Sequence, residues 1–226
     1  MKKIIFPIAA ISAICVLTGC ETTGISPRES SGASYQSYIM SLQTGSTNAP
    51  QQVITPIRLA VAQVGEAAPP ESMIDRLAKD KSQVASVNGM PLPGDVYYGL
   101  EDYPGRIKKL CNLARSTGAD FVFLFGGTMD SWMENNSWSA LDGTLVGGAI
   151  FPGTKIHVQG KAGGALISTT ICQPIFFADA DASQTRLSPD YFCDGKKVGL
   201  QATVRDQLAA KLTEQLMDKL SAAAIH

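Results

Sequence analysis

Histidine is scarce in this chain, and the residue patterns of common catalytic sites are missing. The 226 residues include two histidines, His157 and His226. A Ser-His-Asp hydrolase would have to use His157, but no serine lies in a G-x-S-x-G elbow. H-E-x-x-H, C-x-x-C and the Walker pattern are also missing. We therefore expect no catalytic residue and no metal site, and we interpret His157 as a strand residue on the surface or satisfied in the core.

Positive charge is also sparse. Lysine and arginine number 19 against 20 aspartates and glutamates, so the net charge is −1. The pairs Lys108-Lys109 and Lys196-Lys197 are short and look like solvated surface. Proteins that bind nucleic acids carry a basic stripe that replaces phosphate counterions, so we expect no nucleic-acid partner.

The apolar run at the N-terminus is too short to span a membrane. It extends from Ile4 to Val16, whereas a spanning helix needs about 20 apolar residues. Lys2 and Lys3 precede the run and Leu17-Thr18-Gly19-Cys20 closes it, which is the three-part plan of a secretory signal. The Leu-x-Gly-Cys ending resembles a lipobox, the cleavage and acylation site of bacterial lipoproteins.

The lipobox resemblance implies that residues 1–19 are a signal peptide and that Cys20 carries lipid on its sulfur and amino group. Two or more acyl chains anchor a protein stably to a membrane. We expect no cofactor besides this covalent lipid. Glu21 follows the acylated cysteine and favours the outer membrane, with the anchor facing the periplasm; the inner membrane is the alternative.

Cysteine is used sparingly, with five in the chain. Cys15 leaves with the signal and Cys20 takes the lipid. Cys172 and Cys193 flank a region with the pattern of a hairpin and its loop, so a disulfide between them is expected in the oxidising periplasm; two buried thiols are the alternative. Cys111 lies on the apolar face of a predicted helix and is interpreted as a core residue.

The composition divides the mature chain into two parts. Residues 20–55 are rich in serine, threonine, glycine and glutamine, which indicates a flexible tether. Residues 56–226 have the patterns of one α/β periplasmic domain.

The expected order of elements in this domain is β-α-β-α-β-β-β-β-α, a single mixed-sheet α/β domain with a long C-terminal helix. The predicted strands are 57–64, 82–87, 121–125, 141–151, 155–168 and 171–182, and the predicted helices are 69–79, 104–117 and 198–224. Gly118 is placed as the C-cap of the second helix. The last helix has an apolar stripe that should face the core: Leu200, Val204, Leu208, Leu212, Leu216 and Leu220.

A segment with two tryptophans is the candidate binding site. Residues 131–139 are polar and read as a loop that carries Trp132 and Trp138, with Asp130 and Glu134 beside them. An acidic, aromatic loop can grip a sugar or a peptide, and exposed aromatic side chains often mark interaction sites. The alternative is a surface lid over the sheet.

Three stretches resemble a known superfamily. They are Arg58 to Ala62, Leu113 to Gly127, and a two-strand hairpin followed by the long C-terminal helix. This layout resembles the envelope lipoproteins that include the curli-secretion lipoprotein CsgG, the penicillin-binding-protein activator LpoB and the TolB N-terminal domain. Thr144 to Gly153 is also similar to a segment of the rhombotarget-type lipoproteins.

The resemblance implies a membrane-anchored periplasmic lipoprotein that acts as a non-enzymatic docking or regulatory factor for an envelope assembly or secretion machine. Its expected partners are the membrane, through the lipid, and another envelope protein. The alternative is a subunit of an oligomeric outer-membrane secretion pore, as in CsgG. A cell-wall-directed enzyme is the least favoured hypothesis, because it would need clustered acidic residues or a nucleophile–base pair, which the sequence does not show.

Overall fold

The computed structural model describes residues 52–65, 68–92, 103–135, 153–188 and 193–225. Cys20, Trp138 and the predicted strand 141–151 lie outside these ranges. The expectations for the signal peptide, the lipid anchor and most of the tether therefore stay predictions.

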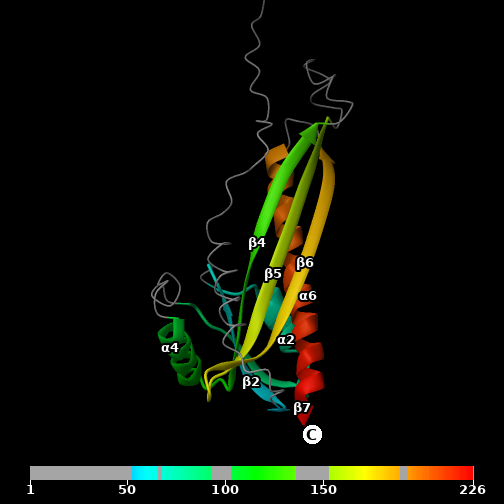
Figure 1. Ribbon diagram of the computed structural model, residues 1–226. Helices are drawn as coiled ribbons and strands as arrows, with labels where there is room; N and C mark the ends of the chain where they lie inside the picture. Colours follow the sequence, from blue (N-terminus) through cyan, green and yellow to red (C-terminus); the bar gives the residue numbers. More distant parts are fainter. Residues whose placement is uncertain (1–51, 66–67, 93–102, 136–152, 189–192, 226) are drawn as a thin grey trace, which may run out of the picture.

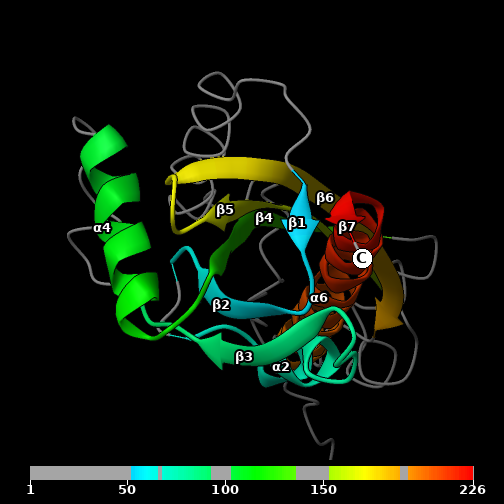
Figure 2. The same cartoon turned by 90° about the horizontal axis from the view of Figure 1, so that it is seen from below.

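A five-stranded mixed sheet forms the centre of the domain, with the strands in the order β3-β2-β4-β5-β6 (Figure 1 and Figure 2). The strands are β2 (Ile57–Gln63), β3 (Val84–Gly89), β4 (Phe121–Asn135), β5 (Thr154–Ser168) and β6 (Gln173–Ser188). β2 pairs in parallel with β3 and β4, whereas β4, β5 and β6 form an antiparallel meander. The predicted fold class, a single mixed-sheet α/β domain, is confirmed.

Within the described ranges, three helices cover the two faces of this sheet. They are α2 (Glu71–Leu77), α4 (Tyr103–Ser116) and α6 (Cys193–Ala223). The chain crosses from β2 to β3 through α2 and then reverses direction across the sheet to β4 through α4. Because parallel crossovers are right-handed, this reversal places α4 on the face opposite α2 and α6 (Figure 2).

A small second sheet joins the two ends of the described domain. β1 (Val53–Ile54) pairs in parallel with β7 (Ala224–Ile225), and Figure 2 shows the two strands side by side. Val53 is 1% exposed. β1 lies within the range predicted as tether, so ordered structure begins before Pro56.

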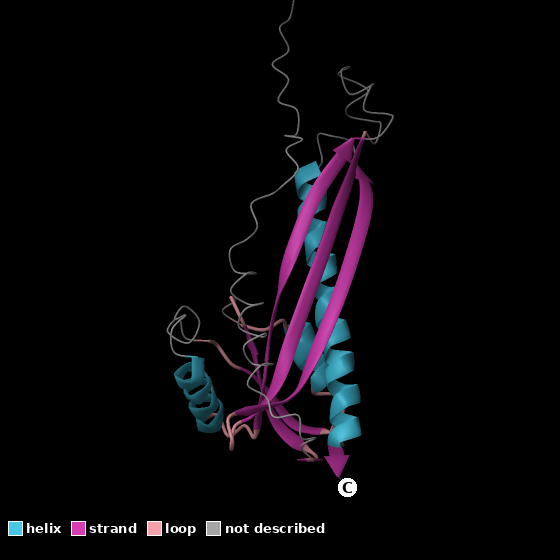
Figure 3. Ribbon diagram, viewed as in Figure 1, coloured by secondary structure: helices cyan, strands magenta, loops and turns pink. Residues whose placement is uncertain are grey.

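The long helix and the long strands match in length. α6 has 31 residues and at 1.5 Å per residue spans about 46 Å. β5 has 15 residues and at about 3.3 Å per residue spans about 50 Å. α6 therefore lies along nearly the whole meander (Figure 3).

Two apolar clusters fill the two sides of the sheet. The larger cluster lies between the sheet and α6 with α2, and it contains every residue of the predicted stripe from Leu200 to Leu220. The smaller cluster lies under α4 and includes Ile107, Leu110, Cys111 and Ala114. Both predicted apolar helix faces are therefore confirmed as core.

Two glycines of β5 make room for this packing. A Cβ at Gly160 would lie 2.7 Å from Leu208 Cδ1, and one at Gly164 would lie 2.5 Å from Phe123 Cζ. Real Cβ atoms do not approach carbon atoms so closely. Glycine at these positions lets α6 and a stacked phenylalanine ring contact the strand backbone directly.

Side chains of α6 also protect the outer edge of the sheet. Lys211 Nζ donates to the carbonyl oxygen of Asp181 at 2.5 Å, and Gln215 Oε1 accepts from the Asp179 N–H at 3.1 Å. Lys219 Nζ donates to the Phe177 carbonyl oxygen. These three residues are spaced four apart and lie on one helix face, so they occupy edge groups of β6 that could otherwise pair with another strand.

Asp120, which follows α4 and Gly118, forms an ion pair with Arg58 of β2. Arg58 Nη2 lies 2.6 Å from Asp120 Oδ1, and Arg58 Nε donates to Oδ2 at 3.0 Å. The hydrogen bond from Arg58 lowers the pKa of the Asp120 carboxyl group. Gly118 has a φ of 78°, as expected of a glycine C-cap. Two stretches of the family resemblance therefore meet in one ion pair that aligns β2 with β4.

The substitution Gly164→Ala should destabilise the domain by about 1–3 kcal/mol, since the added methyl group overpacks the rigid Phe123 ring. The matched control is Gly199→Ala in α6, where an added Cβ meets nothing within 4 Å and alanine favours the helix by about 1 kcal/mol. Urea unfolding measures both changes. Equal stability of Gly164→Ala and the wild type would show that this contact is loose in solution.

The substitution Asp120→Asn should lower stability at pH 7 by a small amount, because Arg58 and Asp120 are 57% and 43% exposed. A carboxyl group with a lowered folded pKa contributes stability above its unfolded pKa of about 3.9 and loses it as pH falls through the folded pKa. The difference between wild type and variant should therefore narrow below about pH 4. Urea unfolding at pH 7 and pH 3 measures this difference in the free energy of unfolding. The same difference at both pH values would contradict the lowered pKa of Asp120.

Candidate partner-binding surface

The predicted tryptophan loop begins as a strand in the structure. β4 continues to Asn135, so Asp130, Trp132 and Glu134 lie on a strand, and the prediction of a loop is wrong for these residues. Met129 and Met133 pack against the α6 side, and the intervening Asp130, Trp132 and Glu134 are exposed. This alternation is the period of a half-buried strand and is the signal that the sequence interpretation missed.

Trp132 stacks on His157 of the neighbouring strand. The two residues are register partners in the β4–β5 pair, so their side chains share one face. Their ring centroids are 5.1 Å apart and the ring planes differ by 4°. The histidine that the sequence interpretation set aside is therefore part of the candidate site.

Two polar side chains brace the stack. Trp132 Nε1 donates to Glu134 Oε1 at 3.2 Å. Glu134 Oε2 lies 3.3 Å from His157 Nε2, within ion-pair distance but without hydrogen-bond alignment. On the other side, the Thr185 hydroxyl of β6 forms a 3.0 Å hydrogen bond with His157 Nδ1. Thr185 has no local sequence signal, because only the pairing of β5 with β6 brings it here.

We call Trp132, Glu134, His157 and Thr185 the Trp132 surface. Trp132 is 37% exposed, and Leu187, two residues after Thr185 on β6, is 47% exposed. The surface therefore combines exposed apolar area with a carboxylate that can accept hydrogen bonds. Fixed aromatic side chains beside polar groups are typical of binding hot spots.

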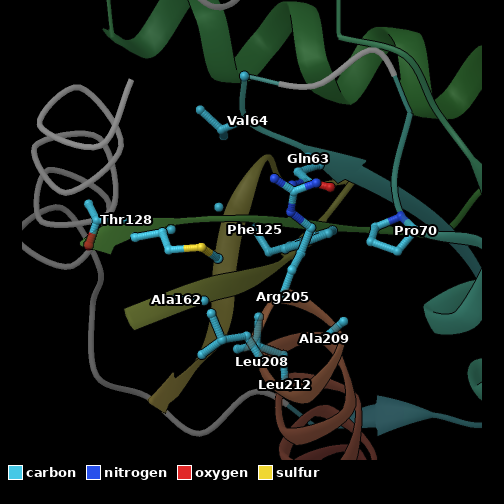
Figure 4. A pocket seen from close by; sticks show the side chains of 14 residues that line it. Gln63, Val64, Pro70, Phe125, Thr128, Ala162, Arg205, Leu208, Ala209 and Leu212 are labelled. Carbon is cyan, nitrogen blue, oxygen red and sulfur yellow. The ribbon is translucent and has the colours of Figure 1, made fainter. Parts of the chain in front are cut away.

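A pocket lies on the opposite side of the sheet, beside α6 (Figure 4). Phe125, Leu208 and Leu212 contribute apolar walls, and Gln63 and Arg205 contribute polar groups. Its volume is about 110 Å³, below the roughly 300–1,000 Å³ of ligand pockets. It has room for a side chain or a few waters and not for a drug-sized molecule.

The predicted disulfide between Cys172 and Cys193 is not formed. Cys193 belongs to the cluster under α6, whereas Cys172 packs against the cluster under α4. No disulfide joins Cys172 to Cys193 in this structure. A bridge would have to pass through the sheet, so this prediction is wrong.

Within the described ranges, no group of three or more histidine, cysteine, aspartate or glutamate side chains is arranged to hold a metal ion. No helix in the same part of the chain is long and apolar enough to cross a membrane.

No protein-family model and no curated protein matches this chain. Its fold is distantly similar to solved bacterial lipoproteins. A minor lipoprotein from Acinetobacter baumannii is 10% identical, with a TM-score of 0.41 over 74% of this chain and 94% of that chain. A lipoprotein from Neisseria meningitidis is 16% identical, with a TM-score of 0.28 over 69% and 99%.

A PelC dodecamer from Paraburkholderia phytofirmans is also similar, at 14% identity and a TM-score of 0.35 over 79% of this chain and 96% of that chain. Likenesses at this level do not establish a shared function. Membership in the predicted superfamily is not shown by them.

The substitution His157→Ala should expose more of the Trp132 ring, because the stacked imidazole covers one of its faces. In a Trp138→Phe background Trp132 is the sole tryptophan, so fluorescence reports on it alone. We expect a red-shifted emission and stronger quenching by acrylamide. Gln159→Ala, an exposed β5 residue on the same face, is the control; equal quenching in both variants would contradict the stack.

Proposed function

We propose that the protein is a lipid-anchored periplasmic factor that docks another envelope protein through the Trp132 surface and catalyses no reaction itself. The lipobox at Cys20 supports the anchor. The tether, residues 20–55, has an r.m.s. reach of about 30 Å if flexible, which would let the domain meet a partner away from the membrane.

The observation that carries this proposal is the braced, exposed tryptophan. Trp132 keeps 37% of its surface exposed although His157 stacks on it and Glu134 binds its indole nitrogen. A side chain held in one position loses little conformational entropy on binding. Such preorganised aromatic residues contribute much of the affinity at protein interfaces.

The chemistry of the surface indicates what it would bind. Trp132 and Leu187 offer apolar contact, and the Glu134 side chain is 58% exposed with a carboxylate that accepts hydrogen bonds. A partner segment with an apolar or aromatic side chain beside a lysine, arginine or backbone N–H group fits this combination.

The alternative, an oligomeric pore subunit, is less well supported. A ring built by strand pairing needs two open edges on each subunit. The edge of β6 is occupied over Phe177–Asp181 by α6 side chains. On the other side of the sheet β3 is the edge strand, and β2 pairs with β4 only as far as Phe125. Among the described residues, β3 and the far half of β4 therefore offer open edges on that side, but a ring would also need the edge of β6.

In-cell crosslinking tests the proposal. A photo-crosslinking residue at Gln159, beside the Trp132 surface, should capture one distinct envelope protein from cells that express the full chain. The same residue at Glu214, exposed on α6, should not. Crosslinks only to further copies of the chain, in a large ring, would support the pore alternative and contradict docking.

The substitution Trp132→Ala should then reduce capture at least tenfold, as the loss of a hot-spot residue costs about 2 kcal/mol or more. The matched control is Val198→Ala on α6, where the valine is 65% exposed. Circular dichroism checks that both variants fold. Unchanged capture by Trp132→Ala would show that the interface lies elsewhere.

A further inference from the structure

Two cysteines meet where α4 covers the sheet. Cys111 lies on the buried face of α4 and is 0% exposed. Cys172 ends the turn between β5 and β6 and packs against the same apolar cluster. The two residues are far apart in the sequence, so only the tertiary fold brings them together.

Both residues converge on one backbone carbonyl group. The Cys111 sulfur lies 3.9 Å from the Ser168 oxygen, and the Cys172 N–H donates to the same oxygen at 2.9 Å. The Cys172 sulfur lies 3.7 Å from the Thr169 oxygen. The carbonyl oxygen of Ser168, the last residue of β5, therefore lies next to both cysteines.

The side chains of the two cysteines also lie close to each other. Burial and then a hydrogen bond with the Cys172 side chain raise the pKa of the Cys111 thiol. Arg115, one helical turn after Cys111, donates from Nη2 to the Cys172 sulfur at 3.7 Å. The Cys172 sulfur is therefore held against α4, within reach of Cys111.

The backbone at Cys172 has an uncommon conformation. Its φ is 53°, the left-handed region, where glycine or asparagine is usual and other side chains are rare. The turn thus keeps a cysteine at a position that favours other residue types, which is expected if this side chain is needed there.

We infer that Cys111 and Cys172 form a disulfide in the mature protein, which links α4 to the β5–β6 turn. The inference rests on the periplasmic location proposed above, because that compartment is oxidising. It assigns a covalent link to Cys111, the cysteine interpreted from sequence as plain core, and it takes Cys172 away from the predicted partner Cys193.

The bond would form by exchange with a disulfide oxidant, such as a protein dithiol oxidase. Cys172 is the partly exposed sulfur, so its thiolate attacks the oxidant's disulfide and expels one thiolate. The Cys111 thiolate then attacks the mixed disulfide at the Cys172 sulfur and expels the second. The two cysteines are oxidised, the oxidant is reduced, and the two cysteine protons end on its two thiols.

Peptide mapping of the full-length protein tests the link. Cells are acid-quenched, free thiols are alkylated, and the digested protein is analysed without reductant. The expected result is a peptide pair joined through Cys111 and Cys172, with Cys193 alkylated. Alkylated Cys111 and Cys172, or a link to Cys193, would overturn the inference.

Thermal unfolding gives a second readout. Reductant should lower the midpoint of the wild type by roughly 5–15 °C, since closing a loop of this length contributes several kcal/mol. The variants Cys111→Ala and Cys172→Ser should lose this response, whereas the control Cys193→Ser should keep it. A wild type that does not respond to reductant would overturn the inference.

Oxidation of the purified protein with glutathione disulfide separates the two premises. If the disulfide forms in vitro but not in cells, the inference is overturned because the protein does not reside in the oxidising compartment proposed above. If the disulfide does not form in vitro, the inference is overturned because Cys111 and Cys172 are not close enough to bond. Neither readout involves the Trp132 surface, so failure of partner docking remains a separate result.

Discussion

The packing of α6 along the β4–β6 meander is the contact on which the rest of the domain depends. Strands of 15 and 16 residues are long for a globular protein and need an apolar cover of equal length. The leucine stripe of α6 supplies it. Gly160 and Gly164 allow the close approach, and Lys211, Gln215 and Lys219 bind the edge of β6. One helix thus covers a face and protects an edge.

With one face covered by α6, the opposite face has two regions with different chemistry. At the end near β2, α4 buries a small apolar cluster with the sulfur pair Cys111 and Cys172. Towards the other end, β4, β5 and β6 carry the Trp132 surface. A rigid α6 interface and a link that fixes α4 would both hold the sheet in one shape. Preorganisation of this kind lowers the cost of binding.

Much of the fold could be predicted from local pattern. The stripe from Leu200 to Leu220, the apolar run from Phe121 to Phe125 and the C-cap at Gly118 have signals that short-range physics explains. The prediction failed where the pattern was weak. Residues 131–139 are mostly polar, which obscures the alternation of Met129 and Met133 with exposed residues, so the predicted strand 121–125 is ten residues shorter than β4. The disulfide prediction failed because proximity in a hairpin pattern says nothing about which face a cysteine occupies.

The sequence by itself determined the fold class and the apolar faces of the helices, and it predicts a secretory and lipidation signal, because each of these depends on neighbouring residues. The tertiary structure decided the site. His157 joins Trp132 only through the β4–β5 register, Thr185 joins through the β5–β6 register, and Cys172 meets Cys111 only because α4 lies over the turn that holds Cys172. Strand register and helix placement arise from the burial of the whole sheet, and no short window of the chain contains that information.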